Sequence, residues 1–301
     1  MQQLVNLQFT MFSMIAAGVI LKKLGIIGEE GKNNLTDLVI FLILPSNIIK
    51  SFMVEFEVDI LFTFGGVLII SILIQVICTL LGRVLYNRME LPKKKCLHYG
   101  TICSNAGFLG NPIAEGVFGT MGLTLASIYL IPQRIVMWSA GISVFTESPN
   151  KKTLIKKVLT HPCIIACVIG ILLMVTQLQL PGFLTATIQT LSSCNTALSM
   201  MVIGMILADI NAKSMLDKKV LYFTFIRLIL IPILVYIPCE LLHVNSLITG
   251  VCVLLAAMPA GATTSILASK YHGDAEFATN LVIVSTLASL ITTPIWSTIL
   301  V

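Results

Sequence analysis

The stretch Ser104-Asn105-Ala106-Gly107-Phe108-Leu109-Gly110-Asn111-Pro112 lies inside an apolar run. Pro112 removes a backbone donor and clashes with the preceding helical turn, and it disfavours the α conformation at Asn111. The two glycines permit an irregular backbone path, and the two asparagine amides can bind the backbone groups that this path frees. Within lipid, such backbone is tolerated only where protein buries it or where it lines a wet cavity. The stretch therefore predicts a broken membrane helix whose ends face a ligand, with a simple proline kink as the alternative interpretation.

A second stretch of the same kind, Met258-Pro259-Ala260-Gly261-Ala262-Thr263-Thr264-Ser265, lies in an apolar run near the other end of the chain. It again combines proline and glycine with free hydrogen-bonding side chains. The motif glycines Gly107 and Gly261 are each followed by another glycine after the same interval of 12 residues. Interrupted segments at corresponding positions of two halves indicate the binding site of a membrane transporter. The positive N-terminal ends of the half-helices would favour an anion.

The composition places the chain in a membrane. Of its 301 residues, 56% are hydrophobic and 11% are charged, and the mean hydropathy is +0.96. A soluble globular chain carries about 25% charged residues, and a disordered chain needs low hydrophobicity. The apolar residues form continuous runs, which differ from the alternating strands of a β-barrel. We expect an all-α polytopic membrane protein embedded in a lipid bilayer, and we exclude a soluble enzyme and a nucleic-acid-binding protein.

Ten apolar runs approach the length of about 20 residues that a spanning helix needs. The predicted spans are 4–21, 35–54, 60–81, 97–118, 123–145, 162–176, 183–208, 221–241, 247–269 and 277–300. Sixteen of the 19 Lys and Arg residues fall in the odd-numbered loops, and Lys50 alone falls in an even-numbered loop. Because basic loops stay in the cytoplasm, this pattern predicts a multi-pass protein of the plasma membrane, or of a bacterial inner membrane, with both termini outside.

The fifth loop divides the spans into two sets of five. We expect a first five-helix repeat over residues 1–147, a cytoplasmic linker over 148–161 and a second five-helix repeat over 162–301. Because each set holds an odd number of spans, the second set enters the membrane from the opposite side. This is the arrangement of an inverted repeat, with broken crossing helices as its fourth and ninth spans.

Two arginines lie within the predicted spans, where a charge is costly and indicates function by default. Arg134 is near the middle of the fifth span, beside Gln133, and its guanidinium can bind a carboxylate through two hydrogen bonds or pair with a neighbouring helix. Arg227 lies about two turns inside the eighth span, and we expect it to extend to the cytoplasmic interface. Small polar residues on the seventh and tenth spans are expected to pack helices together, with Asn195 and Asn280 as candidate ligand contacts.

Motifs for catalysis and metal binding are missing from the sequence. There is no His-Glu-x-x-His, no Gly-x-Ser-x-Gly turn and no Walker-type glycine loop. Cys163 and Cys167 share a helical face, but no His or second Cys pair completes a zinc site. Asp274 is faintly similar to an intramembrane aspartyl protease residue, but no second membrane Asp accompanies it. We therefore expect no enzyme activity, no metal site and no cofactor.

Several segments together resemble the auxin efflux carrier family. They are residues 18–27, Leu44-Pro45-Ser46 with Ser51-Phe52, residues 105–112, Gln133 with Trp138, and Met258-Pro259-Ala260. The resemblance implies ten spans, a scaffold domain beside a transport domain, and a crossover of the fourth and ninth spans. Without a long central hydrophilic loop, the chain is similar to the compact prokaryotic members, which include bacterial malate and malonate permeases. Its Gly110-Asn111-Pro112-Ile113 departs from the Asn-Pro-Asn pattern of the plant carriers.

Together with this resemblance, the residues predict a secondary transporter that moves a small organic anion by alternating access. The substrate would be a carboxylate, such as a dicarboxylate or an auxin-like acid. The expected substrate-binding residues are Asn105, Gly107, Asn111, Pro112, Gln133, Arg134, Pro259, Gly261, Thr263 and Asn280. A proton or sodium as coupling ion, and assembly as a homodimer, stay open. The alternative functions are a sodium-coupled symporter of the bile-acid type and a channel.

Overall fold

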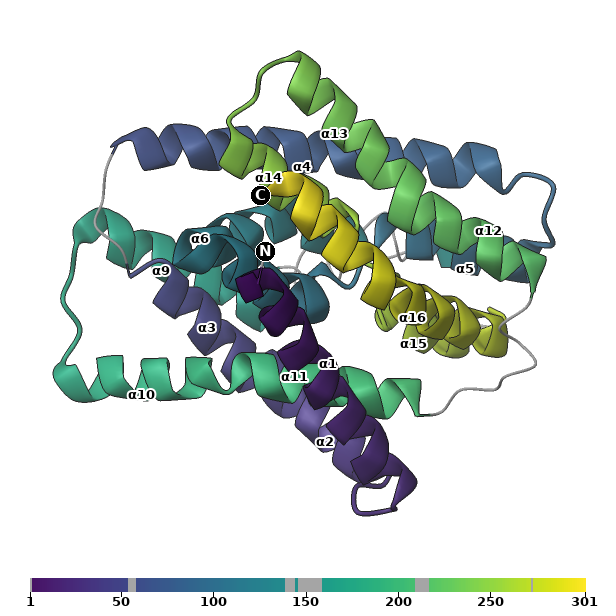
Figure 1. Ribbon diagram of the computed structural model, residues 1–301, viewed down its shortest axis with the longest axis horizontal. Coiled ribbons are helices and arrows are strands. Elements are labelled where there is room, and N and C mark those ends of the chain that lie inside the picture. The colour runs from purple at the N-terminus through teal and green to yellow at the C-terminus, as the bar shows by residue number, and fades with distance from the viewer. Residues whose placement is uncertain (1, 54–57, 139–143, 146–158, 209–216, 272) are drawn as a thin grey trace.

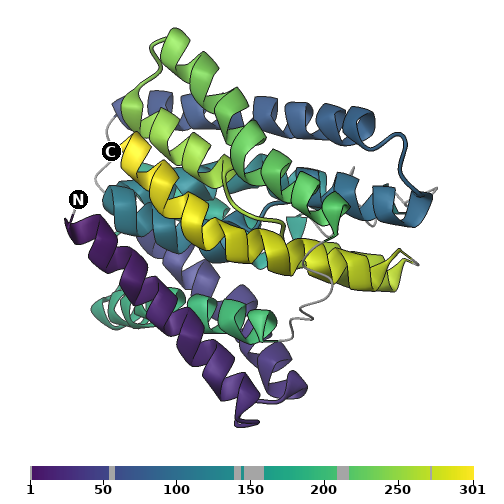
Figure 2. The same cartoon turned by 45° about the vertical axis from the view of Figure 1, so that its right-hand side comes forward.

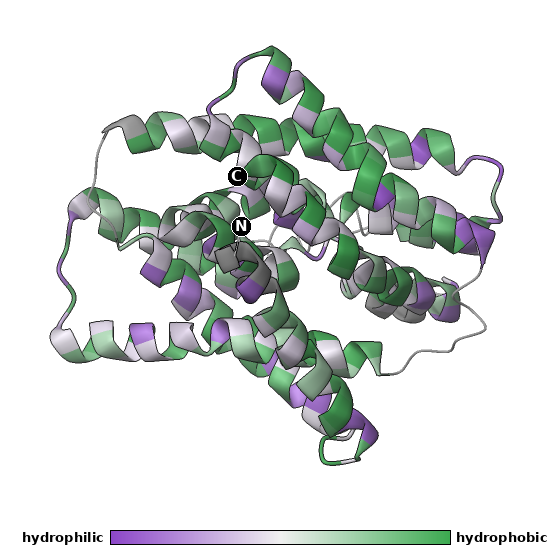
Figure 3. Cartoon of the chain, in the orientation of Figure 1, coloured by the Kyte–Doolittle hydropathy of each residue, from purple (hydrophilic) through white to green (hydrophobic). Residues whose placement is uncertain are grey.

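The regular secondary structure of the described residues is helical. The β-type pairing among these residues is one isolated bridge. The computed structural model describes residues 2–53, 58–138, 144–145, 159–208, 217–271 and 273–301 (Figure 1). The predicted linker 148–161 lies mostly outside the described residues. Figure 3 shows hydrophobic residues along most of the helices and many of the hydrophilic ones at loops and helix ends, as expected for helices that cross lipid.

The helices follow the predicted apolar runs. In chain order they are α1 (Gln2–Lys23), α2 (Glu29–Leu38), η1 (Val39–Ile43), α3 (Leu44–Ser51), α4 (Val58–Leu85), α5 (Leu91–Ile102), η2 (Ala106–Gly110), α6 (Asn111–Trp138), α9 (Pro162–Thr176), α10 (Gly182–Ser193), α11 (Asn195–Leu207), α12 (Lys218–Phe225), η4 (Ile226–Leu230), α13 (Ile231–Leu241), α14 (Ser246–Ala256), α15 (Thr263–Lys270) and α16 (Ala275–Leu300). Within the described residues, six helical stretches are long and apolar enough to cross a membrane, and α9 and α14 are shorter apolar helices. These features confirm an all-α polytopic membrane protein, while the number of ten spans stays a prediction.

Three prolines each follow one wide π-helical turn. Pro45, Pro112 and Pro232 stand two residues after the ends of η1, η2 and η4. A proline ring clashes with the carbonyl group four residues earlier, and a wider turn moves that carbonyl group away. Each helix therefore continues past its proline, with one π-helical turn directly before it.

Gly119 divides α6 into two helical segments. Its φ of 68° and ψ of −162° lie in a region that side chains with a Cβ rarely adopt. Residues 111–118 thus end at a sharp turn, and residues 120–138 form the next long segment. The predicted end of the fourth span and most of the predicted fifth span both lie in α6 for this reason.

The helices pack in two groups. The first group contains α1, α2, α3, α9, α10 and α11, in which α1 packs along α11 and α3 packs against α9 and α10. The second group contains α4 to α6 and α12 to α16. Figure 1 shows α4, α12 and α13 on one side of the molecule and α1, α2, α10 and α11 on the opposite side. The two ends of the chain lie near each other in both views (Figures 1 and 2).

The first group is built on a close backbone contact between α1 and α11. A Cβ atom on Gly204 would collide with the carbonyl oxygen of Ile15, and one on Gly18 would collide with the carbonyl oxygen of Met201. Small residues at such a contact let two membrane helices approach closely and pack over their backbone atoms. This contact joins the first predicted span to the seventh.

Candidate functional site

Two helices of the second group are interrupted, and the interruptions meet in the interior. Residues 103–105 separate α5 from η2, and residues 257–262 separate α14 from α15. We call these two segments together the crossover. Ser104 and Ala260 form an antiparallel bridge at its centre. Segments more than 150 residues apart in the chain are thereby joined through their backbones.

Main-chain hydrogen bonds hold the crossover. The Asn105 amide donates to the carbonyl oxygen of Pro259 at 2.7 Å, and the Gly261 amide donates to the carbonyl oxygen of Cys103 at 2.9 Å. Each interrupted segment thus satisfies polar groups that the other exposes. Irregular backbone buried in a membrane protein requires such partners.

Side chains from two further helices bind the crossover. Gln133 on α6 donates from Nε2 to the carbonyl oxygen of Ser104 at 2.8 Å, and its Oε1 accepts from the Ser104 hydroxyl at 2.9 Å. Ser285 on α16 accepts from the Ala260 amide at 3.2 Å. Both atoms of the Gln133 amide are therefore engaged with the protein. Of the two adjacent candidates for the anion, this leaves Arg134 as the one with free hydrogen-bonding groups.

We expect Gln133→Leu to destabilise the folded protein by about 2 kcal/mol, because two polar groups of Ser104 would lose their buried partner. The matched control is Gln75→Leu, since Gln75 is also buried but its Oε1 has no hydrogen-bond partner in the described structure. This control should stay within about 0.5 kcal/mol of the wild type or gain stability. Thermal unfolding in detergent measures both, and equal losses would contradict the assignment.

Arg134 is a buried cation that forms no salt bridge with the carboxylates of the described residues. Its side chain is 5% exposed, and Nη1 has no hydrogen-bond partner among the described residues. The guanidinium lies beside Gly107 in η2, where a Cβ atom would stand 3.8 Å from Nη2, and it also contacts the Cys163 side chain on α9. The salt bridges of the described residues do not include it. A positive charge thus lies near the N-terminal, positive end of a helical segment.

The surroundings of Arg134 contain a second ionisable group that carries no charge at neutral pH. His161 precedes α9 and caps it by accepting from the Cys163 amide at 3.2 Å. Burial first, and the nearby Arg134 second, lower the pKa of His161 to about 4. The imidazole is therefore neutral at pH 7 and adds no second positive charge beside Arg134.

Asn111 and Pro112 begin α6, directly after the π-helical turn. The Asn111 side chain is 0% exposed, and neither its Oδ1 nor its Nδ2 has a hydrogen-bond partner in the part of the chain that the structure describes. A buried amide without partners costs stability, so such a group calls for an explanation. Asn111 lies one helical turn after Gly107, on the segment that Arg134 approaches.

The remaining candidates lie on the other side of the crossover. Pro259 and Gly261 take part through their backbones, as described above, and Thr263 begins α15 beside Tyr99. Asn280 is part-buried in the first turns of α16. The crossover contact of α16 comes instead from Ser285, five residues further along the helix.

Arg227 is enclosed by the protein, which its position in the predicted eighth span did not indicate. Its side chain is 2% exposed and lies among Cys78, Cys103 and Tyr129, and its Nε and Nη1 atoms have no hydrogen-bond partner among the described residues. The interpretation that it extends to the cytoplasmic interface is wrong. Position along a span indicates depth in the membrane, but it does not show whether neighbouring helices enclose the side chain.

Two interrupted helices that meet in the interior of a helical membrane protein are typical of membrane transporters. The chain matches the family model of the membrane transport proteins over residues 4–157 and 149–297. It belongs to this family, which is the auxin efflux carrier family, so the predicted resemblance is confirmed. The family is one of membrane transporters.

Relatives that are similar in sequence occur in archaea and bacteria. An uncharacterized transporter of Methanothermobacter thermautotrophicus is 27% identical over 293 residues, which cover 95% of each chain. The uncharacterized transporter MJ1031 of Methanocaldococcus jannaschii is 24% identical over 296 residues, which cover 95% of this chain and 96% of its own. The uncharacterized transporter YfdV of Escherichia coli is 25% identical over 201 residues, 63% of each chain.

Proposed function

We propose that this protein is a secondary transporter that moves a small organic anion, with a carboxylate group, through the crossover. The observation that carries the proposal is the buried charge of Arg134, which no carboxylate of the described residues pairs with and which lies beside the N-terminal end of η2. A buried charge is costly without a partner, and a helix N-terminus favours a negative one. A substrate carboxylate would supply that partner, and the free amide of Asn111 would add hydrogen bonds to it.

The position of Arg134 fits alternating access. Arg134 belongs to α6 of the second helix group, and the Cys163 that it contacts belongs to α9 of the first group. When the two helix groups shift against each other, a binding site between them opens to one side of the membrane or to the other. We infer that the first group is the scaffold and the second is the moving transport unit.

The topology that we propose has ten spans in two inverted five-helix repeats, with both termini outside. Contacts between loops support it. Lys219 pairs with Glu90 at 3.9 Å, Lys95 donates to the carbonyl oxygen of Phe145 at 3.1 Å, and Lys93 lies 5.4 Å from the centre of the Phe277 ring. These contacts join the third predicted loop to the seventh, fifth and ninth loop regions, which all belong to the basic side.

Transport in proteoliposomes tests the proposal. We expect saturable uptake of labelled carboxylates, with malate, malonate and an auxin-like aromatic acid as the first probes. Omitting sodium, or collapsing a proton gradient, separates the sodium-coupled alternative from proton coupling. A flux that rises linearly with concentration would indicate a channel. Absence of anion transport under all gradients, by protein that is folded in the same vesicles, would contradict the proposal.

We expect Asn111→Leu to raise the KM for the transported anion about tenfold, because one hydrogen-bonding side chain of the site is lost. The unfolding temperature should stay unchanged or rise, since leucine has a similar volume and removes a buried amide without partners. Asn6→Leu on the exposed surface of α1 is the control for the substitution itself. A loss of stability with an unchanged KM would assign Asn111 to the fold.

A further inference from the structure

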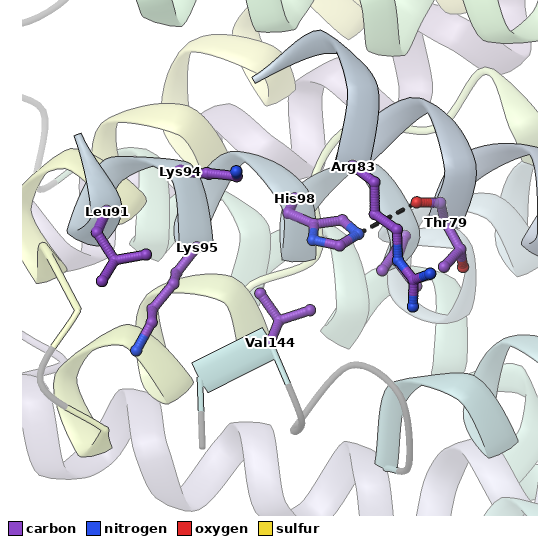
Figure 4. Close-up of a pocket in the computed structure, with 8 residues that line it drawn as sticks. Thr79, Arg83, Leu91, Lys94, Lys95, His98 and Val144 are labelled. Atoms are coloured by element: carbon purple, nitrogen blue, oxygen red, sulfur yellow. Dashed lines mark hydrogen bonds between the residues drawn. The ribbon is translucent and has the colours of Figure 1, made fainter. Parts of the chain in front are cut away.

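A cavity lined in part by basic residues lies between α4 and α5, and Arg134 is not among its lining residues. Its volume is about 260 Å³, and we call it the basic pocket. It is lined by Thr79, Arg83, Leu91, Lys94, Lys95, His98, Ile102 and Val144. Figure 4 shows His98 and Arg83 next to each other and the Lys94 side chain extending toward them. Three of the eight lining residues are permanently cationic, and none is acidic.

The charges of the basic pocket are not neutralised by the described residues. Lys94 donates to the side-chain oxygen of Asn87 at 2.9 Å, and Lys95 donates to the carbonyl oxygen of Phe145 at 3.1 Å. Both acceptors are neutral amide groups. Arg83 takes part in none of the salt bridges between the described residues. Like charges around one cavity repel each other, so the pocket favours an anionic ligand.

Close packing of α4 on α5 gives the pocket a fixed wall. His98 donates from Nε2 to the carbonyl oxygen of Thr79 at 3.2 Å, because a carbonyl oxygen can only accept. The His98 ring lies over Gly82, where a Cβ atom would collide with the ring. The imidazole is thus held between the two helices. One wall of the cavity is therefore fixed by the packing of the two helices.

The basic pocket lies where lipid headgroups meet the protein. The apolar stretch Ile60–Leu85 has 26 residues and a length of about 39 Å, which exceeds the hydrocarbon core of about 30 Å, so its last turn reaches the headgroup layer. Arg83 belongs to this last turn. Leu80 and Val84 beside it on α4 are 54% and 68% exposed, and Leu91 at the pocket rim is 65% exposed. An anion site at this depth adjoins apolar side chains that face the hydrocarbon.

We propose that the basic pocket binds the phosphate headgroup of an anionic phospholipid, whose acyl chains lie along Leu80 and Val84. Basic pockets between membrane helices on the cytoplasmic side are suited to such headgroups. A free phosphate ester offers the same charge but gains nothing from the exposed apolar residues. The site is separate from the proposed transport site, and its test measures binding alone.

Binding of phosphatidylglycerol to the full-length protein in neutral detergent tests this site, with native mass spectrometry as the readout. We expect the wild type to bind phosphatidylglycerol in preference to phosphatidylcholine. Arg83→Gln with Lys94→Gln should weaken this binding about 30-fold, which corresponds to about 1 kcal/mol for each basic residue at the membrane surface. The charge-matched control, Lys23→Gln with Arg88→Gln, removes two exposed cations that do not line the pocket and should change the affinity less than twofold.

Each outcome decides for or against the lipid site. Equal weakening in the two double variants would overturn it in favour of a diffuse surface charge. Glycerol 3-phosphate that binds as tightly as phosphatidylglycerol, and is lost in the same variant, would overturn the lipid in favour of a soluble anion. Equal binding of phosphatidylglycerol and phosphatidylcholine would show that the pocket does not recognise an anionic headgroup, and would overturn the proposal. If the double variant does not fold, Arg83→Gln alone removes an exposed side chain and should weaken binding about fivefold.

Discussion

Arg134→Gln is expected to lower the rate of anion transport about 100-fold at low substrate concentration, because a buried ionic contact with the ligand is worth several kcal/mol. The same variant should be at least as stable as the wild type. The guanidinium is buried, lies near the positive end of η2 and has no carboxylate partner among the described residues, so its removal relieves an electrostatic cost. Transport and thermal unfolding should therefore change in opposite directions.

Two further variants sharpen this test. Arg134→Lys keeps the charge but loses the planar pair of donors, so we expect a partial recovery of transport. Arg88→Gln makes the same substitution in an exposed loop and should leave both transport and stability unchanged. If Arg134 only holds α6 and α9 together, Arg134→Gln will unfold at a lower temperature, and its transport will fall only as far as the folded fraction does. If Arg227 bound the anion in place of Arg134, then Arg227→Gln would be the variant that lowers transport without lowering the unfolding temperature.

Gly204→Ala is expected to destabilise the protein by about 3 kcal/mol, since overpacking a close contact costs about 1 to 3 kcal/mol and here the opposing atoms cannot rotate away. The added methyl group would collide with the Ile15 carbonyl oxygen, which belongs to the backbone of α1. The two helices would have to separate along their whole contact. The readout is the thermal unfolding temperature of the purified protein, together with its yield from membranes.

Gly65→Ala is the matched control for Gly204→Ala. Gly65 lies inside α4, and a Cβ atom added there meets no atom within 4 Å. Alanine favours a helix over glycine by about 1 kcal/mol, so this variant should gain stability. Gly18→Ala combined with Gly204→Ala should cost less than the two single losses together, because one separation of α1 from α11 relieves both collisions. Equal effects at positions 65 and 204 would contradict a backbone contact.

Much of the helical architecture could be predicted from local chemistry. Proline removes a donor and glycine relaxes the backbone wherever they occur, so Pro112 and Pro259 mark the neighbourhoods of the two interruptions without knowledge of the fold. The apolar runs likewise follow from the thickness of the membrane. The positions of the helices, and the fact that the protein spans a membrane, depend on residues that are adjacent in the sequence, so the sequence alone indicates them.

The parts that could not be predicted depend on contacts between distant residues. The hydrogen bonds between Gln133 and Ser104 join residues 29 positions apart on different helices, and nothing in either local sequence distinguishes Gln133 from a free ligand contact. The burial of Arg227 depends on α4, the crossover and α6, which place Cys78, Cys103 and Tyr129 around it. The choice of Ser285 over Asn280 at the crossover is set by the position of α16 along its neighbours.

The crossover has a consequence for how relatives of this protein can diverge. Its central link consists of peptide groups, which every residue carries, so most side-chain replacements at positions 104 and 260 leave the link in place. Only proline at positions 105 or 261 would delete one of the two donated hydrogens. Side chains around this main-chain link can therefore differ between relatives, and the transported molecule can differ with them. The link that positions these side chains does not have to change.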